Sequence, residues 1–424
     1  MTISMQDFCE LIHSEELDRN RALWFLLDVL DQDAVERVNG GNSVCLPTGA
    51  EWDDLSSKDV AGFPAIVIAS VDARWRKQAV EALGTVARGV PLIEIQNGYK
   101  GHANMAGFAR KYGAEGLGDL LREGKEIPAR GVLNLADVQW KRREYICRSG
   151  IPSLDEKIGG FGVGELSIWT GKRGEGKSTL LGQMLLSAID QGQSVFAYSG
   201  ELMAWQFKDW IMTQAAGPGN VSKHQREDSH HVTYFASNSI RWHIDRWLNG
   251  KFWLYDNTLP GSYEPEALLS MMKQVHRQYG VKVFLLDNLM SLQIAGRDMY
   301  RAQSELVGNF VSFAKQTGTH VHLVCHPRKT GEAEIEGDDI SGSGDILNRA
   351  DNGFSLKRRG ADPTGKQVAE LKILKSRSTG ARGDIGLNYD PTCRRFAGIG
   401  QPHNWQYGWE TFSECDEQTP FDGM

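Results

Sequence analysis

The chain has 424 residues, of which 41% are hydrophobic and 24% are charged. These proportions are typical of a folded globular protein and exclude collagen-like, coiled-coil and wholly disordered chains, and the length predicts two or three domains. Lys and Arg total 47 against 54 Asp and Glu, so the net charge is −7, and any nucleic-acid site must be a local basic patch.

No apolar segment reaches the roughly 18 residues of a membrane helix, and the first residues lack the basic and apolar regions of a signal peptide. The sequence therefore predicts a cytoplasmic protein with no membrane partner. Its six cysteines are scattered without a Cys-x-x-Cys pair, which predicts reduced thiols and no structural zinc.

Residues 1–130 alternate helical and strand patterns. Two helices are expected over residues 26–38 and 76–87, and three strands over residues 42–47, 65–70 and 91–95. Alternation at this spacing favours parallel βαβ packing. Residues 131–149 are charged on one side and apolar at intervals of three and four, which predicts a linker helix. That helix is either an ordinary surface helix or one that packs against a partner.

A phosphate-binding loop follows the linker. The strand-like residues 165–170 lead into Gly171-Lys172-Arg173-Gly174-Glu175-Gly176-Lys177-Ser178, and a helix-length apolar segment begins at Thr179. This is the pattern Gly-x-x-x-x-Gly-Lys-Ser in the strand, loop and helix context that the motif requires. Backbone N–H groups wrap the phosphates of ATP or another NTP, Lys177 reaches the β- and γ-phosphates, and the Ser178 hydroxyl binds Mg²⁺. The residues expected to bind the nucleotide are Gly171, Gly174, Gly176, Lys177, Ser178 and Thr179.

Two further strands are expected to end in acids beside this loop. Residues 281–287 form a buried-strand pattern that ends in Asp287, which would hold Mg²⁺ with Ser178. Residues 194–199 form another and are followed by Glu201. A carboxylate there could accept a proton from the attacking water, or it could be a first-turn helix residue favoured by the helix dipole. The chemistry alone leaves both roles open.

Several motifs resemble a known family. Gly150-Ile151-Pro152-Ser153-Leu154-Asp155 and residues 159–166 precede the loop as in RecA-like ATPases. Asp287-Asn288-Leu289 and Cys325-His326-Pro327-Arg328-Lys329 are similar to elements of the replicative ring helicases of the phage primase-helicase, Twinkle and DnaB type. The resemblance covers about residues 10–400. It implies an α/β fold class, with a RecA-like P-loop ATPase domain at residues 150–400 behind a smaller α/β domain at residues 1–130.

The resemblance also implies roles for single residues. Glu201 matches the catalytic glutamate, and His326 matches the γ-phosphate sensor. Arg377 matches an arginine finger, with Lys375 as an accompanying cation. Because such a finger acts across a subunit boundary, the match implies a homo-oligomeric, hexameric ring. Two further residues, Arg358 and Tyr389, match the positions that sandwich the nucleotide base.

The resemblance places single-stranded DNA on the polar segment after His326. Arg328 and Lys329 supply positive charge, and Gly342, Ser343 and Gly344 allow close approach of a phosphate. The same segment contains five acids, which would repel DNA. The expected DNA contacts are therefore the two basic residues and the Gly342–Gly344 stretch, and not the segment as a whole.

Residues 27–123 resemble a Toprim domain, the metal-binding half of DnaG-like primases. Val29 stands where that family has its glutamate, and Ser70 and Asp72 stand for its Asp-x-Asp pair. One carboxylate does not concentrate enough negative charge for Mg²⁺. A degenerate, structural Toprim-like domain is therefore expected, with an unrelated α/β domain as the alternative.

Residues 401–424 contain five acids and no Lys or Arg. This segment is too short and acidic for a core of its own, which predicts a mobile acidic tail. Phe421 is expected to bind a replication polymerase or a single-strand-binding protein. The alternative is a solvated end that only aids solubility.

These patterns and the resemblance predict an ATP-dependent DNA helicase that forms a ring on single-stranded DNA. One alternative from the same fold is a RecA- or RadA-type recombination ATPase. Another, from a different class, is a non-enzymatic adaptor that uses ATP as a conformational switch, which an intact Glu201 disfavours.

Overall fold

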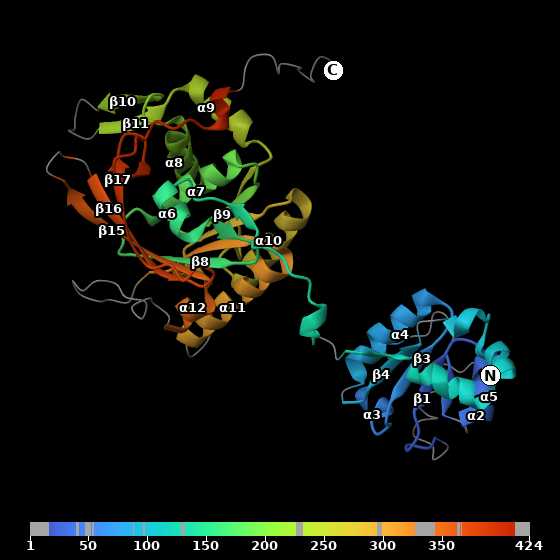
Figure 1. Cartoon of the computed structure of the whole chain (residues 1–424). Coiled ribbons are helices and arrows are strands. Elements are labelled where there is room, and N and C mark those ends of the chain that lie inside the picture. The colour runs from blue at the N-terminus through green and yellow to red at the C-terminus, as the bar shows by residue number, and fades with distance from the viewer. Residues whose placement is uncertain are drawn as a thin grey trace, which may run out of the picture. The chain divides into compact units, whose positions relative to one another are not determined.

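The computed structural model describes residues 17–39, 42–46, 52, 55–87, 89–95, 98–128, 132–225, 232–294, 299–326, 344–362, 365 and 367–411. The chain divides into two compact units, Met1–Lys141 and Arg142–Met424 (Figure 1). Each unit has its own sheet and its own hydrophobic clusters. Across these ranges, every helix is too short or too polar to cross a membrane.

The front unit is built on a five-stranded sheet in the order β2-β1-β3-β4-β5. The first four strands are parallel and β5 is antiparallel to β4. Their bounds are β1 Leu23–Leu26, β2 Ser43–Cys45, β3 Ile66–Ala69, β4 Leu92–Ile95 and β5 Lys125–Ile127. Along β1, Leu23 and Phe25 join one buried cluster and Trp24 joins the other. The strand is therefore covered on both faces, as continuous apolar runs in parallel sheets are.

The helices of the front unit are α2 Val29–Asn39, α3 Ser57–Val60, α4 Ala73–Val86 and α5 Met105–Arg122, with a 3₁₀ turn, η2, at Gly98–Gly101. The alternation of helices and strands expected from the sequence is present. The first expected helix, residues 26–38, begins late, because Leu26 still belongs to β1. A four-residue apolar strand cannot be separated from a helix start by periodicity alone.

The predicted linker helix over residues 131–149 is wrong. Residues 132–149 contain only a 3₁₀ turn, η3 Leu135–Asp137, and a short strand, β6 Tyr145–Cys147, which pairs with β7 Phe161–Gly162. The apolar side chains that gave the helical pattern are exposed, with Leu133 at 79% and Trp140 at 81%. A helix draws most of its stability from an apolar face packed against another element, and the part of the chain that the structure describes leaves these side chains uncovered.

The second unit is built on a nine-stranded sheet in the order β12-β9-β13-β14-β8-β15-β16-β17-β18. The strands from β12 to β15 are parallel, and β16 to β18 continue as an antiparallel meander. Their bounds are β8 Leu166–Thr170, β9 Val195–Ser199, β12 Phe252–Leu254, β13 Val283–Asp287, β14 His320–Val324, β15 Asn352–Ala361, β16 Gln367–Ser376, β17 Gly383–Asp390 and β18 Arg395–Gly398.

Helices cover both faces of this sheet (Figure 1). One face packs on α6 Pro152–Ile158, α7 Lys177–Asp190, α8 Ala204–Ala216 and α9 Asn238–Leu248, and the other on α10 Pro265–Tyr279, α11 Met299–Thr317 and α12 Gly344–Arg349. Alternate residues of the central strands divide between the two clusters: Val283 and Leu285 face the first, and Phe284 and Leu286 face the second. A separate hairpin is formed by β10 Val221–Gln225 and β11 Val232–Ala236.

The prediction of a mobile tail from Gln401 is wrong for residues 401–410. The Arg395 guanidinium is fully buried between the rings of Trp405 and Tyr407, at 4.7 and 5.1 Å. It donates to the carbonyls of His403 and Trp405 and to those of Gln214 and Ala215 at the end of α8. The aromatic residues therefore pack on the core of the second unit instead of forming one of their own. Phe421 lies outside the described residues.

Candidate active site

The phosphate-binding loop has a backbone that requires glycine. Gly171 has φ 143° and Gly176 has φ 94°, values that favour glycine. A Cβ added at Gly171 would lie 2.3 Å from the Leu356 carbonyl oxygen. The loop thus runs closely against β15 before α7 begins at Lys177. The helix N-terminus directs its free N–H groups at the loop, which suits an anion.

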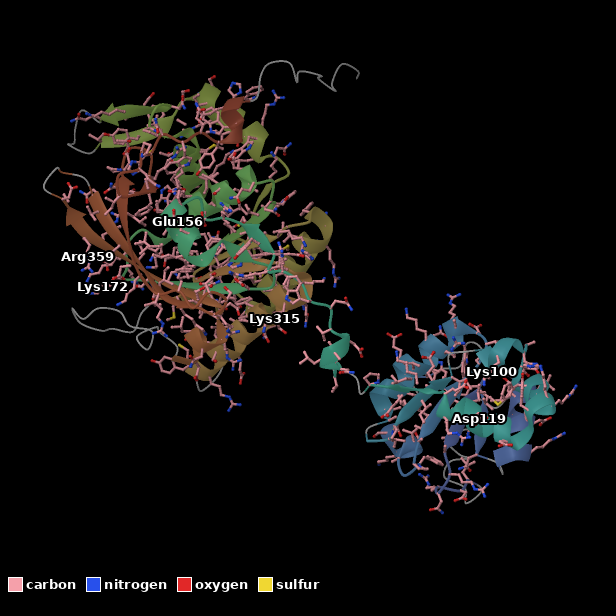
Figure 2. The ribbon with its side chains drawn as sticks, in the orientation of Figure 1. Lys100, Asp119, Glu156, Lys172, Lys315 and Arg359 are labelled. Carbon is pink, nitrogen blue, oxygen red and sulfur yellow. The ribbon has the colours of Figure 1, made fainter. Side chains whose placement is uncertain are left out.

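Lys177 is folded into its own loop. Its Nζ donates to the carbonyl oxygens of Gly171 at 2.7 Å and Lys172 at 2.9 Å, and the side chain is only 6% exposed. Burial lowers the pKa of the ammonium, and the carboxylates of Asp287 and Glu175 oppose that shift. The neighbouring Lys172 is exposed at the surface (Figure 2). The buried lysine is held where phosphate oxygens would compete with the two carbonyls.

Asp287 ends β13 beside the loop, as expected. Its carboxyl is 7% exposed, and burial raises its pKa to about 6, although a hydrogen bond from Ser178 opposes the shift. A hydroxyl and a carboxylate in contact give a set of oxygen donors of the kind that Mg²⁺ prefers. The residues present therefore fit the ion that the sequence predicts here.

Glu201 and His326 follow two other parallel strands at the same edge of the sheet. Glu201 comes after β9 and is 65% exposed at its side chain, and His326 comes after β14. Their nearest atoms, Glu201 Oε1 and His326 Nε2, lie 3.7 Å apart. Burial lowers the pKa of His326, and the Lys177 charge lowers it further. The helix α8 is capped by Met203, so Glu201 is not its N-cap.

These residues line one cavity of about 520 Å³. Within it, the Arg358 guanidinium stacks on the Tyr389 ring at 4.6 Å. The full lining is Arg173, Gly174, Gly176, Lys177, Ser178, Thr179, Glu201, Trp210, Asp287, Asn288, His326, Arg358, Tyr389, Pro391 and Arg394. The structure therefore brings together most of the nucleotide residues named from the sequence.

Trp210 and Arg394 are among the lining residues that the sequence reasoning missed. Arg394 lies 4.4 Å over the ring of Trp210, which projects from α8. Arg394 has φ 54°, a left-handed conformation that is uncommon outside glycine and tends to occur at functional sites. No periodicity marks either residue, because their meeting depends on a contact between α8 and the turn before β18.

The chain is similar to one family model and to a known protein. Residues 133–332 match the model of a family described as an AAA domain. A Twinkle homolog protein, chloroplastic/mitochondrial, of Arabidopsis thaliana is 25% identical over 270 residues, which cover 59% of this chain and 36% of that protein. The chain thus spans about a third of the length of this curated relative.

Two solved structures share the fold. The ATPase domain of G40P matches with a TM-score of 0.50 and 17% identity, over 59% of this chain and 90% of that one. A structure titled as a DnaB-like replicative helicase and its interactions with primase matches with a TM-score of 0.50 and 14% identity, over 68% of this chain and 71% of that one.

The resemblance to the DnaB and Twinkle type is confirmed. The second unit therefore has the RecA-like ATPase fold of that type. The site roles carried over from the resemblance, and the Toprim-like nature of the front unit, stay predictions.

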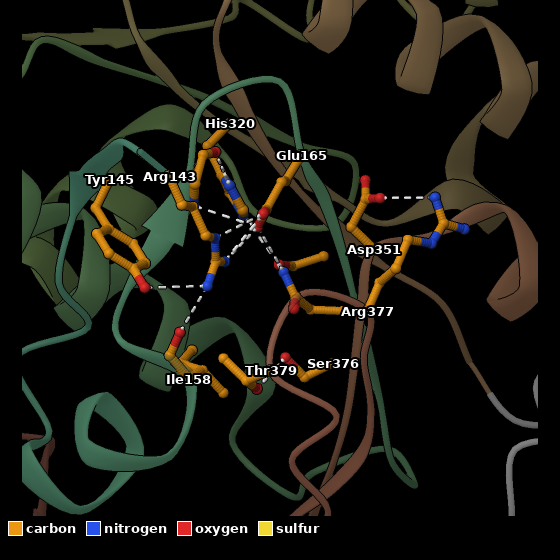
Figure 3. Close-up of polar contacts among 12 residues, drawn as sticks. Arg143, Tyr145, Ile158, Glu165, His320, Asp351, Ser376, Arg377 and Thr379 are labelled. Carbon is orange, nitrogen blue, oxygen red and sulfur yellow. Dashed lines mark hydrogen bonds and ion pairs between the residues drawn. The ribbon is translucent and has the colours of Figure 1, made fainter. Parts of the chain in front are cut away.

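Arg377 and Lys375 lie away from the cavity. Arg377 Nη1 binds Asp351 Oδ1 at 2.9 Å, and Asp351 Oδ2 accepts the N–H of Leu166, the first residue of β8 (Figure 3). The phosphate-binding loop follows the last residue of β8. Lys375 Nζ donates to the carbonyls of Leu347 and Asn348. The two cations are therefore at the opposite end of β8 from the loop of their own chain.

The expected DNA contacts are mostly outside the described residues, namely Arg328, Lys329, Gly342 and Ser343. Gly344 is the first residue of α12.

In the front unit, Val29 begins α2, Ser70 follows β3, and Asp72 is the N-cap of α4. Among the residues that the structure describes, no group of three or more His, Cys, Asp or Glu could hold a metal ion.

Proposed function

We propose that the chain is an ATP-dependent replicative DNA helicase that assembles as a ring on single-stranded DNA and unwinds duplex DNA by sequential ATP hydrolysis. The observation that carries this proposal is the convergence of Lys177, Ser178, Asp287, Glu201 and His326 on one cavity. Lys177 and Ser178 begin α7, Asp287 ends β13, and Glu201 and His326 follow β9 and β14. The RecA-like sheet thus positions all of them at one edge.

The chemistry follows from these side chains. Lys177 leaves the two loop carbonyls for the β- and γ-phosphates, and Ser178 and Asp287 hold Mg²⁺. When bound, Mg²⁺ neutralises phosphate charge. Glu201, on the exposed side of the cavity, accepts the proton of the attacking water. His326 contacts the γ-phosphate and reports its loss to the polar segment that follows it.

A ring is supported by the position of Arg377. Arg377 lies at the far end of β8, held by Asp351, so it cannot approach the phosphates of the same chain. A neighbouring copy would supply the finger, which is worth about 10³ to 10⁵ in rate in other NTPases. The hexamer, the single-stranded DNA track, and a polymerase or single-strand-binding protein as partner of residues 412–424 are parts of this proposal.

Phosphate release by the full chain tests the enzymatic part. We expect turnover with ATP and Mg²⁺ that rises several-fold with single-stranded DNA, and none with Glu201→Gln. Negative-stain images under the same conditions should show rings. Nucleotide binding without hydrolysis would contradict the proposal and favour the adaptor, whereas filaments on DNA would favour a recombination ATPase.

A further inference from the structure

Asn288 lies between the two residues proposed as base and sensor. It follows Asp287 directly at the end of β13 and is only 3% exposed. Its side-chain nitrogen is 2.6 Å from Glu201 Oε1 and 3.1 Å from His326 Nε2. Glu201 Oε1 and His326 Nε2 are 3.7 Å apart, close enough for an ion pair when the imidazole is protonated but too far for a good direct hydrogen bond. The Asn288 amide therefore supplies the hydrogen bonds that connect Glu201 to the neutral imidazole.

The orientation of this amide is fixed by a third contact. Asn288 Oδ1 accepts the backbone N–H of Ser291 at 3.1 Å. A backbone N–H can only donate, so the oxygen must face Ser291 and the NH₂ group must face Glu201 and His326. The usual ambiguity between the oxygen and the nitrogen of an Asn side chain is thereby removed.

The same geometry selects one tautomer of His326. An amide NH₂ has two protons and no acceptor, so it donates one to Glu201 Oε1 and the other to His326 Nε2. An imidazole nitrogen that accepts carries no proton, and the neutral ring then carries its proton on Nδ1. His326 Nδ1 is buried and has no hydrogen-bond partner among the described residues. The Nδ1–H group of His326 is thus a donor that no described residue accepts from.

Further contacts hold the backbone of Asn288 in place. The Ser291 hydroxyl donates to the Asn288 carbonyl at 2.7 Å, and it also contacts the Tyr198 hydroxyl at 3.1 Å. A Cβ added at Gly200, next to Glu201, would lie 1.9 Å from Ser291 Oγ. Gly200 thus allows β9 and the turn after β13 to approach closely enough for the amide to reach Glu201.

We propose that Asn288 is a positioning residue that couples Glu201 to His326 and holds His326 with its proton on Nδ1. A displacement of His326 by the γ-phosphate is transmitted through one amide to the carboxylate that activates water. The inference rests on the proposed function for the roles of Glu201 and His326. Its hydrogen-bond geometry belongs to the nucleotide-free chain and needs no turnover to be measured.

The tautomer is tested by nitrogen NMR of full-length chain labelled with ¹⁵N-histidine, with the His326 signals identified by their loss in His326→Gln. We expect the unprotonated signal from Nε2 and the protonated signal from Nδ1. In Asn288→Asp, which has the same shape but cannot donate, the proton should move to Nε2. A wild-type chain with its proton on Nε2 would overturn the inference without any variant.

Kinetics test the coupling. Asn288→Asp and Asn288→Ala should lower kcat about 10- to 100-fold and leave KM for ATP within about threefold, because a hydrogen bond to a charged group is lost. The double variant with Asn288→Ala and His326→Ala should lower kcat no further than the worse of the two single variants, since both residues lie on one path. A double variant whose loss of kcat is the product of the two single losses would overturn the coupling.

Asn257 provides a matched control. It also sits beside the end of β9, and its amide donates to the carbonyls of Ser199 and Leu202 at 2.8 and 3.0 Å. Asn257→Asp should lower thermal stability but leave the His326 signals and kcat unchanged. If it shifts the His326 signals as Asn288→Asp does, a general packing effect replaces the proposed link.

Failure of the proposed function can be distinguished from failure of the proposed role of Asn288. A wild-type chain without ATPase activity would overturn the proposed function and the coupling that rests on it. A wild-type chain that hydrolyses ATP through Glu201, but whose kcat and His326 signals are unaffected by Asn288→Asp, would overturn the role of Asn288 alone.

Discussion

The two units use acids differently at equivalent places. In both sheets, some of the parallel strands end in an acid or are followed by one at their carboxyl ends. In the front unit, Asp28 after β1 accepts the N–H of Leu30 at 2.8 Å, and Asp72 after β3 caps α4. In the second unit, Asp287 and Glu201 face a cavity. The same topology thus gives helix caps in one unit and a site for phosphate chemistry in the other.

The electrostatic consequences differ as well. In the second unit, burial raises the pKa of Asp287 to about 6 and lowers that of Lys177. In the front unit, burial also raises the pKa of Asp31, but Tyr99 Oη and the N–H of Met105 donate to its carboxylate. Buried ionisable groups that face a cleft are typical of functional sites, whereas satisfied ones are typical of cores.

The largest effect is expected when the buried Lys177 is removed. Lys177→Ala should reduce phosphate release below detection, because no other ammonium is buried in the loop to meet the phosphates. The fold should persist, since the two hydrogen bonds that Lys177 Nζ donates go to carbonyls of its own loop. Phosphate release and circular dichroism of the same preparations are the measurements, with the exposed Lys172→Ala as control. DNA-stimulated turnover in Lys177→Ala would remove this residue from the mechanism.

Arg377 offers the next test, because the proposed function has it act at the site of a second copy. Arg377→Ala should lower kcat by about 10³. Mixing Arg377→Ala chains with Glu201→Gln chains should restore part of the activity, since some interfaces then combine an intact finger with an intact base. Mixtures no more active than either variant alone would contradict action across a subunit boundary.

The buried carboxyl of Asp287 should affect the free energy of unfolding. In the folded chain, burial raises the pKa of Asp287 to about 6 from 3.8. Above pH 6 the folded chain therefore has to bury this carboxylate as an anion, whereas the unfolded chain keeps the same anion in water. Asp287→Asn should therefore raise the free energy of unfolding by about 3 kcal/mol at pH 8 in EDTA. The gain should fade as the pH falls through 6 towards 4. Urea unfolding at pH 8 and pH 5 measures it, and an equal gain at both would contradict the pKa.

The smallest effect is expected in the front unit. Asp72→Ala removes the N-cap of α4 and should cost about 1 kcal/mol of stability, while ATPase activity stays within about twofold. Asp72→Asn, which keeps a capping oxygen, is the control. Template-directed incorporation of ribonucleotides should be absent in the wild type. An RNA product that depends on Asp72 would show that the front unit also has a catalytic site.

The sequence was informative wherever a local pattern decides the structure. The buried strands that end at Asp287 and near Glu201, and the glycine-rich loop before Lys177, were all predicted from runs of adjacent residues. The first helix was misplaced by a few residues, because the short strand β1 has no alternation of its own.

Features that depend on distant contacts were not predictable in this way. The linker has a helical pattern, but the residues that the structure describes leave its apolar side chains exposed, whereas the residues after Gln401 look like a tail but pack around Arg395. The role of Asn288 was equally hidden, because it depends on three strand ends meeting at one amide.

The central claim is that the polar cavity of the second unit drives DNA unwinding, and strand separation measures it most directly. Full-length chain should displace the labelled strand of a forked duplex with ATP and Mg²⁺. Glu201→Gln should displace none, and Asp72→Ala should match the wild type. Wild-type chain that hydrolyses ATP on single-stranded DNA but never separates the fork, across concentrations at which rings are seen, would contradict the account.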